Sequence, residues 1–117
     1  MTRLSSSAVR RAALALALSA PALGLVSLEA RGATPAASVQ IRNFAFVPQV
    51  LTVKPGTTVT WTNSDDDPHT VTASDKTFHS AALDTDDKYS FTFTKPGEYG
   101  YFCSLHPHMT AKIVVKG

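Results

Sequence analysis

The chain has only one cysteine, Cys103, among its 117 residues, so no disulfide can form within it. Small domains bury a modest fraction of their surface and often depend on disulfides or a metal ion for stability. A lone cysteine therefore needs another explanation, which is a free thiol, an intermolecular bridge or a metal ligand. Of these, a bound metal would also supply the cross-link that the missing disulfide leaves out.

An excess of charge of one sign is also missing from most of the chain. The formal net charge is +2, but Arg3, Arg10 and Arg11 all lie near the N-terminus. From residue 31 onward, eight Lys and Arg residues are balanced by eight Asp and Glu residues. A near-neutral domain has no basic surface with which to neutralise phosphates, so nucleic acid is not expected as a partner.

Long hydrophobic runs are confined to the first part of the chain. The segment from Ala12 to Leu28 is apolar apart from two serines and is interrupted by Pro21 and Gly24. It is shorter than the ~20 residues that a spanning helix needs. Basic residues before it and small residues after it are typical of a secretory signal peptide.

We therefore predict that residues 1–37 are a signal peptide and a short N-terminal segment, and that residues 38–117 form one domain. The protein is then exported, to the periplasm or an equivalent compartment, and no stable membrane span is expected after cleavage. The alternative is an uncleaved leader that anchors the chain in a membrane.

No helical period of any length follows the leader. Instead, apolar and polar residues alternate with period two, which indicates half-buried strands. Pro-Gly turns at Lys54–Gly56 and Lys95–Gly97 separate consecutive segments. The pattern predicts an all-β sandwich whose strands include Val39–Arg42, Leu51–Val53, Thr58–Thr62, Tyr89–Thr94, Glu98–Cys103 and Ala111–Val115.

The same alternation predicts which side chains point into the core. Cys103 shares its face with Tyr99 and Tyr101, and His69 shares its face with Val71 at the start of a strand. Met109 has the same parity as the apolar residues that follow it, which are Ala111, Ile113 and Val115. His69, Cys103 and Met109 are thus expected to project inward at strand ends, with His106 on the loop between two strands.

That loop carries the most specific pattern in the chain. Cys103, His106 and Met109 form a Cys-x2-His-x2-Met motif. A thiolate and two imidazoles with a long axial thioether make the site of blue-copper electron-transfer proteins. Because the loop offers one well-placed imidazole, the second is expected from His69. The predicted ligands of one copper ion per chain are therefore His69, Cys103, His106 and Met109.

At this point the chain resembles a known family, the cupredoxins, and in particular their plastocyanin and amicyanin branch. The resemblance runs from about Val39 to Gly117, and the segments that carry it are Asn43–Pro48, Val53–Trp61, Asp67–Val71 and Lys95–Cys103. It implies a Greek-key sandwich of about eight strands with one copper at one end. It also implies single-electron transfer without substrate chemistry, so the protein is not expected to be an enzyme.

The resemblance has two departures. Thr70 stands where many of these proteins have an asparagine that hydrogen-bonds near the cysteine sulfur. The resemblance therefore does not say which hydrogen bonds surround the copper ligands in this chain. His108 stands where amicyanin has an apolar residue, and it competes with His106 as a ligand. Adjacent residues on an extended segment point in opposite directions, so His106 is preferred if Met109 faces the metal.

Several other interpretations remain open. A periplasmic copper carrier or resistance protein would use the same ligands, and zinc would fit them as an adventitious ion. A hydrolase with Cys103 as nucleophile is a further alternative, although a buried thiol argues against it. His79 is expected at the surface, and Asp65–Asp67 is expected to be a solvated turn. Transient redox proteins are the expected partners, through small interfaces, of a monomer.

Overall fold

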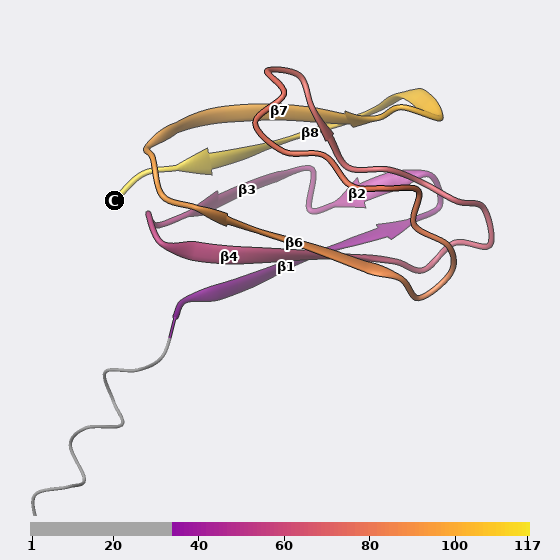
Figure 1. Ribbon diagram of the computed structural model, residues 1–117, viewed down its shortest axis with the longest axis horizontal. Helices are drawn as coiled ribbons and strands as arrows, with labels where there is room; N and C mark the ends of the chain where they lie inside the picture. Colours follow the sequence, from indigo (N-terminus) through magenta and orange to yellow (C-terminus); the bar gives the residue numbers. More distant parts are fainter. Residues whose placement is uncertain (1–33) are drawn as a thin grey trace, which may run out of the picture. The chain divides into compact units, whose positions relative to one another are not determined.

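Eight strands arranged in two layers account for most of the residues that the computed structural model describes, which are residues 34–117 (Figure 1). The predicted signal peptide falls mainly on residues outside this range. Within residues 34–117 there is no helix long and apolar enough to cross a membrane. The strands are β1 (Ala36–Arg42), β2 (Ala45–Val47), β3 (Val50–Val53), β4 (Thr57–Asn63), β5 (Thr72–Ala73), β6 (Lys88–Phe93), β7 (Gly97–Cys103) and β8 (His106–Val115).

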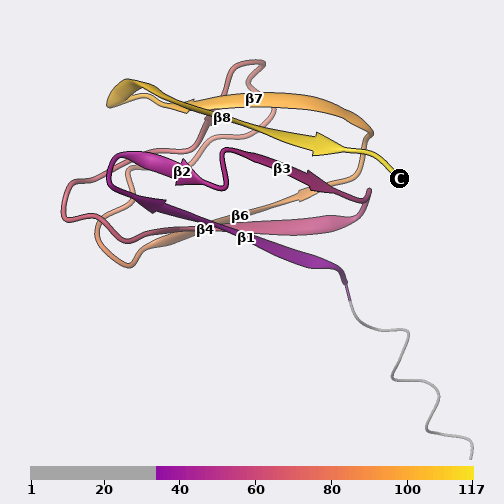
Figure 2. The same ribbon diagram turned by 180° about the vertical axis from the view of Figure 1, so that it is seen from behind.

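Each layer is a mixed four-stranded sheet. One sheet has the order β2-β1-β4-β6 and the other has the order β3-β8-β7-β5. The pairs β1–β4 and β3–β8 are parallel, whereas the other neighbours are antiparallel. Seen from behind, β7 and β8 lie in the upper layer, and β1 and β4 lie in the lower layer (Figure 2). The predicted all-β sandwich is confirmed for the described residues.

All six strands expected from period-two alternation are present, with ends that differ by a few residues. The strand β2 was not predicted, and the strand expected to start at His69 is present only as β5; these two strands have three and two residues. A segment this short contains at most one full period of a strand, so its sequence carries no periodic signal. The clearest alternation belongs to β4, where every second residue from Thr57 to Asn63 is buried.

The core between the sheets is built around the single tryptophan. Trp61 is completely buried and contacts aromatic side chains from three other parts of the chain, namely Phe78, Tyr89, Phe93 and Tyr101. The predicted inward orientation of Tyr101, Cys103 and Met109 is confirmed, because the exposed fraction of each is 5% or less. On the outer face of β4, Thr58 and Thr60 hydrogen-bond to Thr92 and Ser90 of β6, at 2.7 Å in both cases.

Tyr101 gives the fold a pH dependence in alkaline solution. Burial raises the pKa of Tyr101 to about 12, and the Trp61 Nε1–H that it accepts at 3.1 Å partly offsets this effect. In the unfolded chain the phenol has a pKa of about 10. Between pH 10 and pH 12 the folded chain therefore keeps the phenol proton that the unfolded chain has lost. The free energy of unfolding should therefore fall by about 2 kcal/mol as the pH rises from 10 to 12.

This prediction is checked by chemical denaturation at a series of pH values between 9 and 12. Tyr101→Phe should be less stable at pH 9, because Trp61 loses its acceptor, but its stability should decline less steeply above pH 10. Equal slopes in the two proteins would show that another group causes the alkaline loss.

Candidate metal centre

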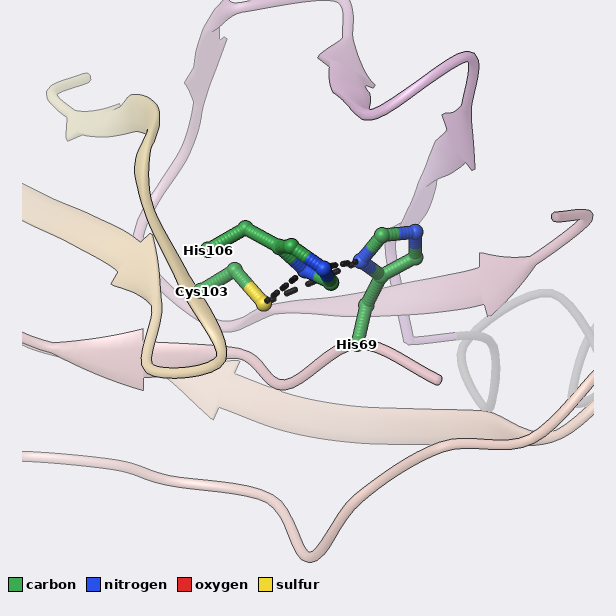
Figure 3. A group of neighbouring side chains, drawn as sticks. All are labelled: His69, Cys103 and His106. Carbon is green, nitrogen blue, oxygen red and sulfur yellow. Dashed lines mark hydrogen bonds between the residues drawn. The ribbon is translucent and has the colours of Figure 1, made fainter. Parts of the chain in front are cut away.

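His69 meets Cys103 and His106, which lie more than thirty residues further along the chain, at one end of the sandwich (Figure 3). The two imidazole Nδ1 atoms of His69 and His106 are 3.2 Å apart. Cys103 Sγ lies 3.8 Å from His69 Nδ1 and 3.6 Å from His106 Nδ1. A thiol sulfur and two ring nitrogens therefore form a small triangle with their lone-pair atoms turned toward one another.

Cys103 enters this triangle from the end of β7. It is the last residue of the strand and its side chain is completely buried. The backbone N–H of Thr70 donates to its sulfur at 3.3 Å. A buried sulfur that accepts a hydrogen bond is held in one orientation, as a metal ligand must be.

His69 lies in the segment between β4 and β5, not at the start of a strand as predicted. Two backbone hydrogen bonds to Leu83, of 3.1 and 2.7 Å, hold it as an isolated bridge. Its side chain is fully buried, and Nε2 faces Asp65 Oδ2 at 2.8 Å. Because the carboxylate accepts the Nε2 proton, the Nδ1 lone pair is left free toward Cys103 and His106.

The segment that follows Cys103 differs in detail from the predicted loop. His106 is already the first residue of β8 and pairs with Cys103 across a tight turn. The next pair joins Phe102 to Thr110, so residues 107–109 bulge out of the ladder. Bulges of this kind re-aim side chains near functional sites. Here the bulge leaves the His106 ring half-buried beside the sulfur.

Met109 lies in that bulge rather than at the end of a strand, which corrects the prediction of its position. Its side chain is buried on the inner face that continues through Ala111 and Ile113. It lines a small cavity together with Phe44 and His108. The structure thus brings His69, Cys103 and His106 together, and it buries Met109 three residues further along.

Thr70, the first departure from the family pattern, makes hydrogen bonds to the turn that follows Cys103 and to the sulfur itself. Its hydroxyl accepts the backbone N–H of Ser104 at 2.8 Å and lies 3.0 Å from the Ser104 hydroxyl. Its own N–H contacts the sulfur of Cys103. Thr70 therefore joins the His69 segment directly to the Cys103 turn. His108, the other departure, is exposed, as is His79.

Three residues that shape this end of the molecule were missed in the sequence. Asn63 is completely buried, and its amide donates to the carbonyls of Asp67 and Leu83 at 2.9 Å each. Its Oδ1 accepts the N–H of Asp65 at 2.9 Å. The alternation of β4 placed Asn63 inward, and a buried amide at the end of an apolar strand face was the signal available.

Asp65 and Phe44 are the other two. The Phe44 ring makes edge contacts with the rings of His69 and His106, at centroid distances of 5.1 and 5.0 Å. Burial raises the pKa of Asp65, but hydrogen bonds from Phe44, Asn43 and His69 outweigh it and leave the pKa below its usual value. Asp65 is thus not simply part of a solvated turn, as had been predicted for Asp65–Asp67.

The size of the triangle fits a transition metal ion. Metal bonds of about 2.0–2.1 Å to imidazole nitrogen and about 2.3 Å to thiolate sulfur place three trigonal ligand atoms about 3.5–3.8 Å apart. The observed separations of 3.2, 3.6 and 3.8 Å are of this size. One soft sulfur and two imidazoles suit copper in both of its common oxidation states, and they also accept zinc.

A two-sheet sandwich that carries a buried thiol and two imidazoles at one end defines the class of mononuclear blue-copper proteins. Comparison with known proteins identifies the family. Residues 12–115 match the family model described as a cupredoxin-like domain. The chain belongs to the cupredoxin-like domain family.

Individual relatives agree with this family. Amicyanin-alpha of Methylorubrum extorquens is 37% identical over 112 residues, which cover 90% of this chain and 94% of the relative. Amicyanin of Paracoccus denitrificans is 39% identical over 83 residues, and the match covers 67% of this chain and 63% of the relative. Plastocyanin of Chlamydomonas reinhardtii is 35% identical, with 96% of this chain and 80% of the relative covered.

Solved structures give the same result for the fold. A purple cupredoxin from Nitrosopumilus maritimus aligns with a TM-score of 0.65 and 32% identity, over 68% of this chain and 99% of that one. A Cu(I) form of an amicyanin variant aligns with a TM-score of 0.65 and 34% identity, over 69% of this chain and 82% of that one. The predicted resemblance to plastocyanin and amicyanin is confirmed.

Proposed function

We propose that this protein is a single-electron carrier with one copper ion that alternates between Cu(II) and Cu(I), without substrate chemistry. The observation that carries the proposal is the convergence of Cys103 Sγ with the Nδ1 atoms of His69 and His106, all within 4.8 Å of one another. Copper in such a site supplies a one-electron couple that needs little rearrangement of its ligands.

We assign the copper ligands to His69, Cys103, His106 and the weaker axial ligand Met109. The burial of Met109 on the inner face of β8 supports the axial role. His108 is the rival of His106, and its exposure argues against it. The ligands then come from the His69 segment and the β7–β8 hairpin, which Thr70 ties together.

His69 and His106 would have different roles at the copper ion. His69 is buried and fixed by Asp65, so it holds the ion from the protein side. His106 is half-buried, next to the exposed Leu105 and beside the exposed Phe44, which is 47% accessible. Electrons would enter and leave through the outer edge of the His106 ring. Small, weak interfaces with transient redox partners suit this port, and the carrier would act as a monomer.

The leader supports export of the carrier. We propose that residues 1–37 are the signal peptide with a short N-terminal segment and that residues 38–117 are the mature Greek-key domain in the periplasm or an equivalent compartment. A membrane-anchored carrier would retain the same copper site.

An electron carrier and a copper carrier differ in what happens after reduction. We expect the Cu(II) protein to accept one electron per chain from a reduced cytochrome, and to return it to a one-electron oxidant while the copper stays bound. The measurement is stopped-flow absorbance together with the copper content of the protein after a desalting step. A zinc-loaded sample should accept no electron, and it serves as the control. Loss of copper to a metal-free acceptor protein on each reduction would contradict electron transfer and favour the copper carrier.

A further inference from the structure

The two-residue turn between β1 and β2 adopts a backbone conformation that its residues do not favour. Asn43 and Phe44 have φ angles of 53° and 56°, in the left-handed region. Two such residues in succession match the tight hairpin turn in which Asn-Gly is strongly preferred. Phenylalanine has no such preference, because its Cβ crowds the backbone there. Another part of the molecule must therefore hold Phe44 in this conformation.

The carboxylate of Asp65 makes the contacts that hold it. Asp65 Oδ1 accepts the N–H of Asn43 at 2.7 Å, and Oδ2 accepts the N–H of Phe44 at 2.9 Å. Oδ2 also accepts the Nε2–H of His69 at 2.8 Å. One carboxylate thus joins both amides of a turn to a histidine that lies more than twenty residues away in the sequence.

The turn between β1 and β2 also places the aromatic ring of Phe44 against the metal centre. The Phe44 ring meets the His69 ring at an interplanar angle of 87° and the His106 ring at 86°. Asp65 is itself fixed from behind, because its N–H donates to Asn63 and its carbonyl accepts the Thr85 hydroxyl at 2.7 Å. The carboxylate of Asp65 therefore determines which nitrogen of His69 carries the proton. Through Phe44 it also affects the packing of the His69 and His106 rings.

We propose that Asp65 is a positioning residue of the copper centre, which orients His69, fixes its Nε2–H tautomer and seats the Phe44 ring against both histidines. This inference rests on the copper site proposed above. A negative charge hydrogen-bonded to a ligand imidazole makes that imidazole a stronger donor, and it stabilises Cu(II) more than Cu(I). Removing the charge and the bond should favour Cu(I).

The test compares Asp65→Asn with Asp66→Asn in the full chain. Both changes remove one acidic charge from the same turn, but Asp66 is exposed. An asparagine at position 65 can accept with only one of the two atoms that Asp65 uses. We expect Asp65→Asn to weaken Cu(II) binding relative to Cu(I) by about tenfold, which is a rise in midpoint potential of about 59 mV for a one-electron couple. Asp66→Asn should shift the potential by less than a third of this amount, and equal shifts would overturn the proposal.

A second measurement needs no copper. In the metal-free protein, amide hydrogen exchange at Asn43 and Phe44 should be at least about tenfold faster in Asp65→Asn than in Asp66→Asn, because two backbone donors lose or weaken their acceptor. Unchanged protection at both amides would overturn the clamp. Because this readout is independent of copper, a chain that binds no copper would refute the proposed function while the exchange data still decide the role of Asp65.

If Asp65→Asn does not fold, the proposal can still be tested on the unmodified chain. Nitrogen NMR of the metal-free protein should show the His69 proton on Nε2, with slower solvent exchange than the ring protons of the exposed His108. A proton on Nδ1 of His69, or exchange as fast as that of His108, would overturn the proposal.

Discussion

The intense visible absorption of the copper-loaded protein should disappear when Cys103 is replaced by serine. The absorption comes from the bond between copper and a thiolate, and a serine hydroxyl is a hard donor that stays protonated at neutral pH. Sulfur is also the atom that the two Nδ1 atoms face at 3.6 and 3.8 Å. The measurement is a titration of the metal-free protein with Cu(II), followed by absorption and paramagnetic-resonance spectra. A variant that kept the band would refute Cys103 as a ligand.

Two histidines near the start of β8, His106 and His108, give this experiment a matched control. His106→Ala removes an imidazole that faces the sulfur, so the band should be lost or strongly shifted. His108→Ala removes an exposed imidazole two residues away, so the spectrum should not change. The opposite result would exchange the roles of the two histidines.

Replacing Trp61 by alanine should destabilise the fold more than any change at the surface. Trp61 is completely buried and contacts four aromatic rings from both sheets and from the β5–β6 connection. Truncation of a buried tryptophan costs about 3–5 kcal/mol, while the total stability of a domain is about 5–15 kcal/mol. Denaturant unfolding of the metal-free variant, followed by far-ultraviolet circular dichroism, should show a greatly lowered midpoint or a chain that is already unfolded.

The control for this change lies on the same strand. Thr62 follows Trp61 in β4 but points to the outer, partly exposed face. Thr62→Ala should therefore cost about 0.5 kcal/mol or less. Similar losses in the two variants would mean that the strand, and not the aromatic cluster, is the sensitive element.

The parts of the structure that could be predicted were those with a local signal. The alternation of β4 and β7 indicated both the strands and their inner faces, and the Cys103, His106 and Met109 spacing indicated a metal loop. The short strands β2 and β5 gave no period, and they form because long neighbouring strands offer them hydrogen-bonding partners. The bulge that extends β8 through His106 depends in the same way on the pairing with β7.

The residues that hold the metal ligands in place could not be predicted, for a different reason. Asp65 looks like the first residue of an acidic turn, and nothing near it in sequence distinguishes it from Asp66 or Asp67. Its partners, the amides of Asn43 and Phe44 and the ring of His69, are set by the packing of β1 and β4. A single sequence does not contain that pairing, so the role of Asp65 became visible only in three dimensions.

The parallel pairing of β3 with β8 has a consequence for how the protein is made. Val50 pairs with Lys112 and Val53 with Val115. The ladder between β3 and β8 therefore forms only after the last strand of the chain has been made. Pairings between such distant segments form slowly, because a long loop must close before any contact rewards it. During synthesis, Cys103 and His106 emerge before β8 is complete. The nascent chain thus contains all four proposed ligands before the ladder between β3 and β8 can close.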